Sequence, residues 1–235
     1  MASTVEVLAD AIKESGTPFI VGHPGGETVE LMDAASQRDM RYILMKQETA
    51  GAILAATWGE ITGSPGVCTS TRGPGATNMV NGVAYAWLDR APLIALTDQY
   101  PGTTLETGQR QVINHRQIYD PITKWSTTLY AKGAHQQIRR ALRTATAPTP
   151  GPVHIDVPAG EATAEAPAMK FPPDLLQNTL ATIPVEETLA PALDMIRRAK
   201  RPILLAGLGV LWDHASAELV RFAEALGRSE ERRVG

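Results

Sequence analysis

The sequence predicts an α/β fold in which an open, mostly parallel sheet carries helices on both faces. Short apolar runs alternate with segments of helical period over residues 4–158, which is typical of parallel α/β sheets. Turns rich in glycine and proline follow several of these apolar runs. The 235 residues are 43% hydrophobic and 20% charged, which is enough apolar material to bury a core.

The elements of this fold follow from periodicity. The first helix is predicted over residues 4–15, because its apolar residues share one face and Gly16 follows it. Further helical periods predict helices over 27–36, 47–60, 76–87 and 134–147. Short apolar runs between them predict buried strands over 18–21, 41–45, 66–71, 92–97 and 153–157. The pattern becomes irregular through Gly108 and His115, which indicates a functional loop.

The composition changes after residue 160. Alanine, proline and glutamate dominate, and the prolines interrupt any period, so a semi-rigid linker is predicted. Beyond it the pattern predicts a helix over 185–200, a strand over 202–206 and a helix over 215–226. Because a lone strand cannot form a sheet with a buried face, we expect the chain to stop inside a second domain. The predicted division is a first domain over 1–160, a linker over 161–184 and an incomplete domain over 185–235.

The final eight residues, 228–235, include five charged side chains where a continuing α/β domain would supply an apolar strand. Two interpretations stay open: a frayed, solvated end, and a sequencing or cloning scar joined to a truncated reading frame.

Charge and composition exclude several classes of protein. The chain has 22 basic and 25 acidic residues and a net charge of −3, so it carries no basic footprint for nucleic acid. It lacks the apolar run of ~18 residues that a membrane helix needs, and its N-terminus does not resemble a secretory signal. The single cysteine, Cys68, is expected inside a buried strand and fits a cytoplasmic location.

Three turns are predicted at the carboxyl ends of strands, where open α/β sheets bind ligands: residues 22–26, 46–48 and 72–78. Glu48 opens a helix, and its carboxylate fits the helix dipole as well as it fits a catalytic role. The turn 72–78 lacks the lysine of a P-loop. It is one glycine short of a dinucleotide-binding fingerprint, since Asn78 takes the place of the third glycine. Asp98 would be the candidate acidic residue that binds the ribose in that interpretation.

The histidines are individually weak signals. His23 lies in the first turn and His115 in the irregular loop, so either can face a ligand. His135, His154 and His214 are predicted to be structural, because they lie on or beside regular elements.

Taken together, the motifs resemble those of thiamine-diphosphate enzymes of the acetolactate synthase and benzoylformate decarboxylase group. The segments that carry the resemblance are Gly22-His23-Pro24-Gly25-Gly26, Gln47-Glu48, Gly73-Pro74-Gly75-Ala76-Thr77-Asn78, Ala91-Pro92-Leu93-Ile94, Pro121-Ile122-Thr123-Lys124-Trp125-Ser126 and Gly151-Pro152-Val153-His154-Ile155-Asp156-Val157-Pro158. The resemblance covers residues 5–158 as the pyrimidine-binding domain. It continues through 200–209 as the entry to a Rossmann-like central domain.

The resemblance implies that Glu48 is catalytic and bonds the N1′ nitrogen of the cofactor's aminopyrimidine. It implies a cofactor-binding set made up of Pro24, Gly25, Gly26, Glu48, Thr71, Gly73, Gly75 and Asn78. The expected substrate-side residues are His23, Gln99 and His115. The resemblance also implies that the substrate is a small 2-oxo acid. It further implies a homo-oligomer with the site at a subunit interface.

Departures from the family pattern leave the substrate open. Gln47 stands where acetolactate synthases carry histidine, and Thr71 stands where the decarboxylases carry a catalytic histidine. Thr149 replaces an FAD-contacting arginine, which makes FAD doubtful. No metal ligand is assigned here, since the resemblance places Mg²⁺ and the diphosphate on a C-terminal Gly-Asp-Gly…Asn segment that the chain lacks.

We therefore expect an inactive N-terminal part of an acetolactate synthase-like carboligase. A benzoylformate decarboxylase-type enzyme is the alternative within the family. A non-catalytic subunit or pairing module completed in trans, and a dinucleotide-binding protein, are the alternatives from other classes.

Overall fold

The computed structural model describes residues 2–25, 28–105, 107, 110–167, 170–171 and 184–227. The chain forms two compact units, residues 1–179 and 180–235. The boundary falls inside the segment predicted as a linker. Most of that segment beyond residue 167 lies outside the described residues, as do the charged residues 228–235.

The first unit is built on a six-stranded sheet in the order β3-β2-β4-β5-β7-β6, and every strand pairing in it is parallel. Its strands are β2 (Phe19–His23), β3 (Arg41–Leu44), β4 (Gly66–Ser70), β5 (Leu93–Gln99), β6 (Trp125–Thr128) and β7 (Pro152–Pro158). This confirms the predicted α/β class. Strand β6 was not predicted, because its sequence Trp-Ser-Thr-Thr contains no apolar run.

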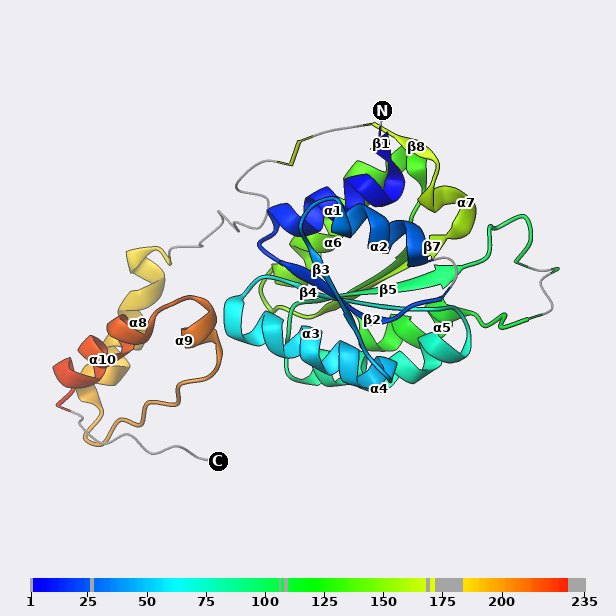
Figure 1. The fold of residues 1–235 in the computed structure, drawn as a ribbon. Helices are drawn as coiled ribbons and strands as arrows, with labels where there is room; N and C mark the ends of the chain where they lie inside the picture. The colour runs from blue at the N-terminus through cyan, green and yellow to red at the C-terminus, as the bar shows by residue number, and fades with distance from the viewer. Residues whose placement is uncertain are drawn as a thin grey trace. The chain divides into compact units, whose positions relative to one another are not determined.

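Helices cover both faces of this sheet (Figure 1). One layer consists of α1 (Thr4–Glu14), α2 (Val29–Ser36) and α6 (Ala134–Thr146). The other consists of α3 (Glu48–Thr62), α4 (Pro74–Leu88) and the short α5 (His115–Tyr119). Each layer closes its own hydrophobic cluster against the sheet, one containing Leu8 and Ile138 and the other Met79 and Cys68.

Two boundaries near the predicted ligand turns differ from the sequence prediction. Gly22 and His23 belong to β2, because Gly22 pairs with both neighbouring strands, so the first turn starts two residues later, at Pro24. Helix α4 starts at Pro74 instead of residue 76, since proline suits the first helical position, where no amide hydrogen is needed. The glycine turn is therefore also a helix N-terminus.

The segment after β7 still packs within the first unit. Helix α7 (Ala159–Ala162) is followed by β8 (Glu165–Ala166), which pairs antiparallel with β1 (Ala2–Ser3). The Phe171 ring stacks on His135 with the ring centroids 4.5 Å apart. Residues 159–166 and Phe171, which the sequence places around the start of the linker, are therefore part of this unit's packing.

The second unit contains α8 (Glu186–Arg198), α9 (Gly209–Trp212) and α10 (Ser216–Ala225). The predicted strand over residues 202–206 is wrong, since these residues form no strand. Ile203 and Leu205 are each 91% exposed. A strand needs a neighbour to pair with, and the described residues of this unit supply none. No helix in the described part of the chain has the length and apolarity to cross a membrane.

Candidate functional site

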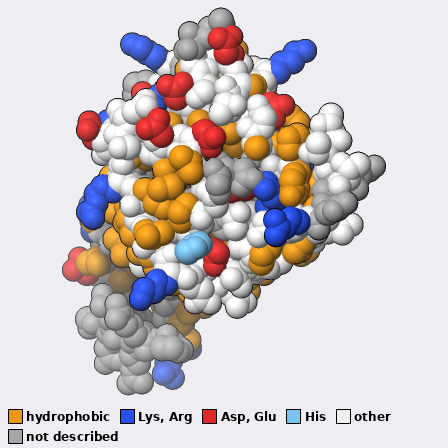
Figure 2. All heavy atoms as spheres, turned by 45° about the vertical axis from the view of Figure 1, so that its right-hand side comes forward, with side chains coloured by type: hydrophobic (Ala, Val, Ile, Leu, Met, Phe, Trp, Pro, Cys, Tyr) orange, Lys and Arg blue, Asp and Glu red, His pale blue; other side chains and the backbone are white. Residues whose placement is uncertain are grey.

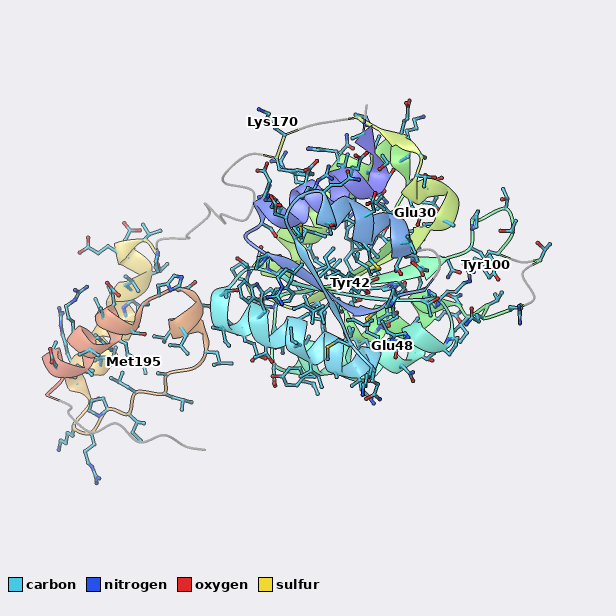
Figure 3. All side chains as sticks on the ribbon, in the orientation of Figure 1. Glu30, Tyr42, Glu48, Tyr100, Lys170 and Met195 are labelled. Carbon is cyan, nitrogen blue, oxygen red and sulfur yellow. The ribbon has the colours of Figure 1, made fainter. Side chains whose placement is uncertain are left out.

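Glu48 begins α3 at the carboxyl ends of the parallel strands. Gln47 has an extended backbone (φ −148°, ψ 136°), so the chain enters the helix at this point. The Glu48 side chain is buried, with 8% exposure, and Nδ2 of Asn78 donates a hydrogen bond to its Oε2 at 3.2 Å. Figure 3 labels Glu48 near the first turn of α3. One carboxyl oxygen is thus held by Asn78, and the other is the candidate reactive atom.

That second oxygen lies beside Gly75, where the packing leaves no room for a Cβ. A Cβ placed on Gly75 would lie 3.2 Å from Oε1 of Glu48 and 2.7 Å from Cγ2 of Thr71. A Cβ on Gly25 would overlap the Thr71 hydroxyl from the other side. The turns after β2 and β4 and the start of α3 therefore converge, bringing these predicted site residues together. Gly26, also predicted for this site, lies outside the described residues.

The buried hydroxyl group of Ser70 lies close to Gly75. The Ser70 side chain is 0% exposed, and its Oγ has no hydrogen-bond partner within the part of the chain that the structure describes. A Cβ on Gly75 would lie 3.6 Å from Cβ of Ser70. Buried hydroxyl groups are normally hydrogen-bonded, so Ser70 is an available polar contact near Gly75.

The packing of α3 on α4 fixes Asn78 relative to Glu48. The Thr49 hydroxyl donates to the carbonyl oxygen of Asn78. A Cβ on Gly82 would overlap the Cβ of Ala52 and lie 2.8 Å from the carbonyl oxygen of Thr49. Because the two helices approach this closely, the amide of Asn78 and the carboxyl group of Glu48 are held on rigid elements.

The residues predicted on the substrate side separate into two places. His23 is exposed at the end of β2, and its Nδ1 hydrogen-bonds the carbonyl oxygen of Met45 at 2.8 Å. Gln99 and His115 are buried together, with Nε2 of Gln99 3.2 Å from Nδ1 of His115. The Tyr100 amide donates to Oε1 of Gln99 at 2.9 Å, which fixes the orientation of that side-chain amide.

His115 belongs to a buried polar network that connects three strands to the glycine turn. Its Nε2 accepts a hydrogen bond from the Gly73 amide at 3.0 Å, and its Nδ1 lies 2.7 Å from Oδ1 of Asp156. The Thr97 hydroxyl donates to the same Oδ1 at 2.7 Å and lies 2.8 Å from Nε2 of His154. Nδ1 of His154 is in turn 2.8 Å from the Ser126 hydroxyl.

Sequence reasoning missed Asp156 and the connection made by His154. These two residues lie two positions apart in β7, so they share one face of the strand. The alternation of His154 and Asp156 with the apolar Val153, Ile155 and Val157 was the available signal. Burial lowers the pKa of His154 to about 4, against the opposing effect of the Asp156 carboxylate. His154 is therefore a neutral structural member of the network at physiological pH.

The donor atoms of His115, His154 and Asp156 all lie within 4.8 Å of one another, a spacing that also suits a metal ion. However, each of these donor atoms already has a hydrogen-bond partner or an ion-pair partner inside the protein. The geometry therefore fits a hydrogen-bonded network better than it fits a metal centre.

A cavity of about 440 Å³ adjoins this network. Tyr100, Arg116 and Tyr130 line it together with Gln99, His115 and Asp156. The Arg72 guanidinium lies over the Tyr100 ring, 3.9 Å from its centroid. The cavity thus combines the aromatic side chains of Tyr100 and Tyr130 with the cation of Arg116.

Apolar side chains are exposed close in sequence to the site. Val29 in α2, Leu44 in β3 and Ile53 in α3 are 56%, 68% and 40% exposed. Figure 2 shows hydrophobic side chains gathered on one face of the molecule, bordered by charged ones. Exposed apolar patches of this kind are typical of interaction surfaces.

The fold and these contacts define an α/β domain with a ligand site at the carboxyl ends of its strands, built around a buried carboxyl group and glycine turns. Residues 2–118 match the family described as "Thiamine pyrophosphate enzyme, N-terminal TPP binding domain". The chain therefore belongs to the thiamine pyrophosphate enzymes, and its first unit contains their N-terminal cofactor-binding domain.

Relatives agree with this assignment. The chain is 36% identical over 224 residues to a probable acetolactate synthase large subunit of Methanocaldococcus jannaschii, covering 93% of this chain and 38% of that protein. It is 34% identical over 221 residues to the acetolactate synthase isozyme 1 large subunit of Escherichia coli, covering 93% and 39% of the two chains. The chain thus spans about two fifths of the length of these curated relatives.

A solved structure supports the fold. The thiamine diphosphate-dependent 4-hydroxybenzoylformate decarboxylase of Rhodococcus jostii RHA1 superposes with a TM-score of 0.84 at 24% identity. The superposition covers 97% of this chain and 43% of that one.

Proposed function

We propose that this chain is the pyrimidine-binding part of a thiamine-diphosphate enzyme acting on a 2-oxo acid, as an acetolactate synthase-like carboligase. The observation that carries the proposal is the Glu48 carboxyl group, buried at the start of α3 with Oε2 held by Asn78 and Oε1 facing the space beside Gly75. The acetolactate synthase relatives favour carboligation. The similarity to a decarboxylase favours simple decarboxylation as the second candidate.

The residues around Glu48 fit an aminopyrimidine ring. Gly25 and Gly75 let the backbone approach so closely that a Cβ at either position would overlap Thr71, and the unpartnered Ser70 hydroxyl offers a buried polar contact. A flat heteroaromatic ring with a protonatable nitrogen suits a narrow space between backbone segments that ends at a carboxyl group. These observations support thiamine diphosphate as the ligand and give no matching support to a dinucleotide.

Within this site, Glu48 would hold a proton at Oε1 and share it with the ring nitrogen of the pyrimidine. Because Oε2 accepts from the Asn78 amide, the proton is directed to Oε1, on the side of Gly75. Asn78 orients the carboxyl group, and the turn residues Pro24 and Gly73 would shape the walls. When bound, thiamine diphosphate supplies the carbanion-stabilising ring that allows cleavage next to a 2-oxo group.

We propose that Mg²⁺ and the diphosphate are held by a part of the enzyme outside this chain, since Mg²⁺ usually bridges phosphate and a few carboxylates. The exposed Val29, Leu44 and Ile53 support a homo-oligomer with the site at its interface. FAD is not part of the proposal. One unpaired cysteine supports a cytoplasmic location.

Nuclear magnetic resonance (NMR) tests the ligand assignment on the chain itself. Thiamine diphosphate at millimolar concentration should shift the amide signals of Gly75 and Asn78, because the ring would lie against them. Glu48→Ala should abolish these shifts, while the exposed-acid control Glu14→Gln should keep them. Absence of shifts in the wild-type chain, or unchanged shifts in Glu48→Ala, would contradict the proposal.

A further inference from the structure

We propose that His115 is a positioning residue: its Nε2 holds the Gly73 amide, and through it the Gly75 wall opposite Glu48. The link between His115 and Gly73 stands on the structure alone, while its effect on cofactor binding rests on the proposed function.

The Gly73 amide needs a specific acceptor. Gly73 is the N-cap of α4, with φ +64° and ψ −114°, a conformation that residues with a Cβ rarely adopt. Amide hydrogens at a helix start have no partner within the helix. This one is buried, and His115 Nε2 accepts it at 3.0 Å. A Cβ on Gly73 would lie 2.6 Å from the carbonyl oxygen of Gln111, so the loop confines the turn from a second side.

The contacts of His115 fix its tautomer. An Nε2 that accepts from a backbone amide carries no hydrogen, so the proton of the neutral ring is on Nδ1. Nδ1 then donates to Oδ1 of Asp156 at 2.7 Å. A doubly protonated ring would place an N–H against the Gly73 N–H. Asp156 therefore selects the tautomer in which Nε2 can hold the turn.

The rest of the network is consistent with this assignment of protons. The Thr97 hydroxyl donates to Asp156, so it accepts from Nε2–H of His154. Nδ1 of His154 then accepts from the Ser126 hydroxyl. Nε2 of Gln99 also lies 3.2 Å from Nδ1 of His115, but the 2.7 Å contact with Oδ1 of Asp156 is shorter and takes the Nδ1 hydrogen. A buried network of such hydrogen bonds is rigid, which suits a positioning role.

The connection to the cofactor side is short. Gly73 is followed by Pro74, the first residue of α4, and then by Gly75, where an added Cβ would lie 3.2 Å from Oε1 of Glu48. If the Gly73 amide loses its acceptor, the turn can relax and narrow or widen the space beside that oxygen. His115 itself lies on the far side of the turn and acts through the backbone.

Two substitutions separate the two hydrogen bonds of the ring. The amide oxygen of His115→Gln reaches the position of Nε2 and can still accept from Gly73. The amide of His115→Asn reaches only the position of Nδ1, so it can serve Asp156 but not Gly73. We expect amide hydrogen exchange at Gly73 to be about tenfold faster in the asparagine variant than in the wild type, and close to wild type in the glutamine variant. Equal protection of Gly73 in both variants, or equal loss in both, overturns the link.

The wild-type chain provides a measurement that does not depend on how well the variants fold. Nitrogen NMR of the His115 ring should show a protonated Nδ1 and an unprotonated Nε2 that is coupled to the Gly73 amide across the hydrogen bond. A protonated Nε2 at neutral pH overturns the inference.

Cofactor titration then tests the functional part. With thiamine diphosphate as the probe, His115→Asn should weaken the binding measured from the Gly75 amide shift about tenfold, and His115→Gln should restore it. If Gly73 protection behaves as expected but both variants bind like the wild type, the positioning role is wrong. If the wild-type chain itself shows no shift, the proposed function fails, and the exchange data still decide the link between His115 and Gly73.

Discussion

Acidification should destabilise this protein through His154. The side chain is 0% exposed, and burial lowers its pKa from 6.5 to about 4, although Asp156 opposes this effect at 3.8 Å. Electrostatic interactions with His115 and Arg116 also lower the pKa of His154. In the unfolded chain the histidine regains its ordinary pKa of about 6.5.

The direction of the pH dependence of stability follows from which state, folded or unfolded, takes up the proton. Above about pH 6.5, His154 is neutral in both states and contributes no pH dependence. Between about pH 6.5 and pH 4, the unfolded chain binds a proton that the folded chain excludes, so stability falls as the pH falls. At ~1.4 kcal/mol for each tenfold change in the dissociation constant, the full loss is about 3 kcal/mol. Below about pH 4 the folded state also binds the proton, and this contribution levels off.

Urea denaturation at several pH values between 7 and 4, followed by circular dichroism, measures this loss. The matched control is His154→Gln, which keeps a polar side chain of similar length but cannot titrate. His135, whose pKa burial also lowers, is present in both proteins and cancels in the comparison. The wild type should lose about 3 kcal/mol more than the variant over this range. Parallel pH dependences of the two proteins would show that His154 is not buried in its neutral form.

Three further outcomes are expected. Gly82→Ala should destabilise the first unit by ~1–3 kcal/mol in urea denaturation, because its Cβ would overlap that of Ala52, whereas the control Gly102→Ala, with no atom within 4 Å, should be nearly neutral. Burial raises the pKa of the Cys68 thiol, so a thiol reagent should react only as fast as the protein unfolds; rapid labelling of the folded chain would contradict this. Where the chain works within a complete thiamine-diphosphate enzyme, Glu48→Gln should lower turnover of a 2-oxo acid by ~10²–10⁴-fold, and near-normal turnover would remove Glu48 from the mechanism.

The local sequence pattern was sufficient to predict much of this fold. Five of the six strands of the sheet were predicted, because their short apolar runs lie between helical periods. The turns beside Gly25 and Gly75 and the acid at the start of α3 were also visible, since parallel strands bring such turns to the same edge. Strand β6 was not predicted, because its polar residues form a strand only by pairing with β7. The strand predicted over 202–206 does not form, because an apolar sequence alone does not supply a pairing partner.

The amino-acid sequence by itself determined the α/β class, the order of the elements, the family of the chain and the choice of Glu48 as its candidate acid. These depend on residue types and their spacing along the chain. Tertiary structure alone decided that Asn78 holds one oxygen of that carboxyl group, and that His115, Asp156 and His154 form one hydrogen-bonded network behind the glycine turn. The hydrogen bonds that connect Asp156 and His154 to Thr97 and Ser126 join residues 28 to 59 positions apart in the chain. Their geometry exists only after the strands and helices have packed, which is why no local pattern contains it.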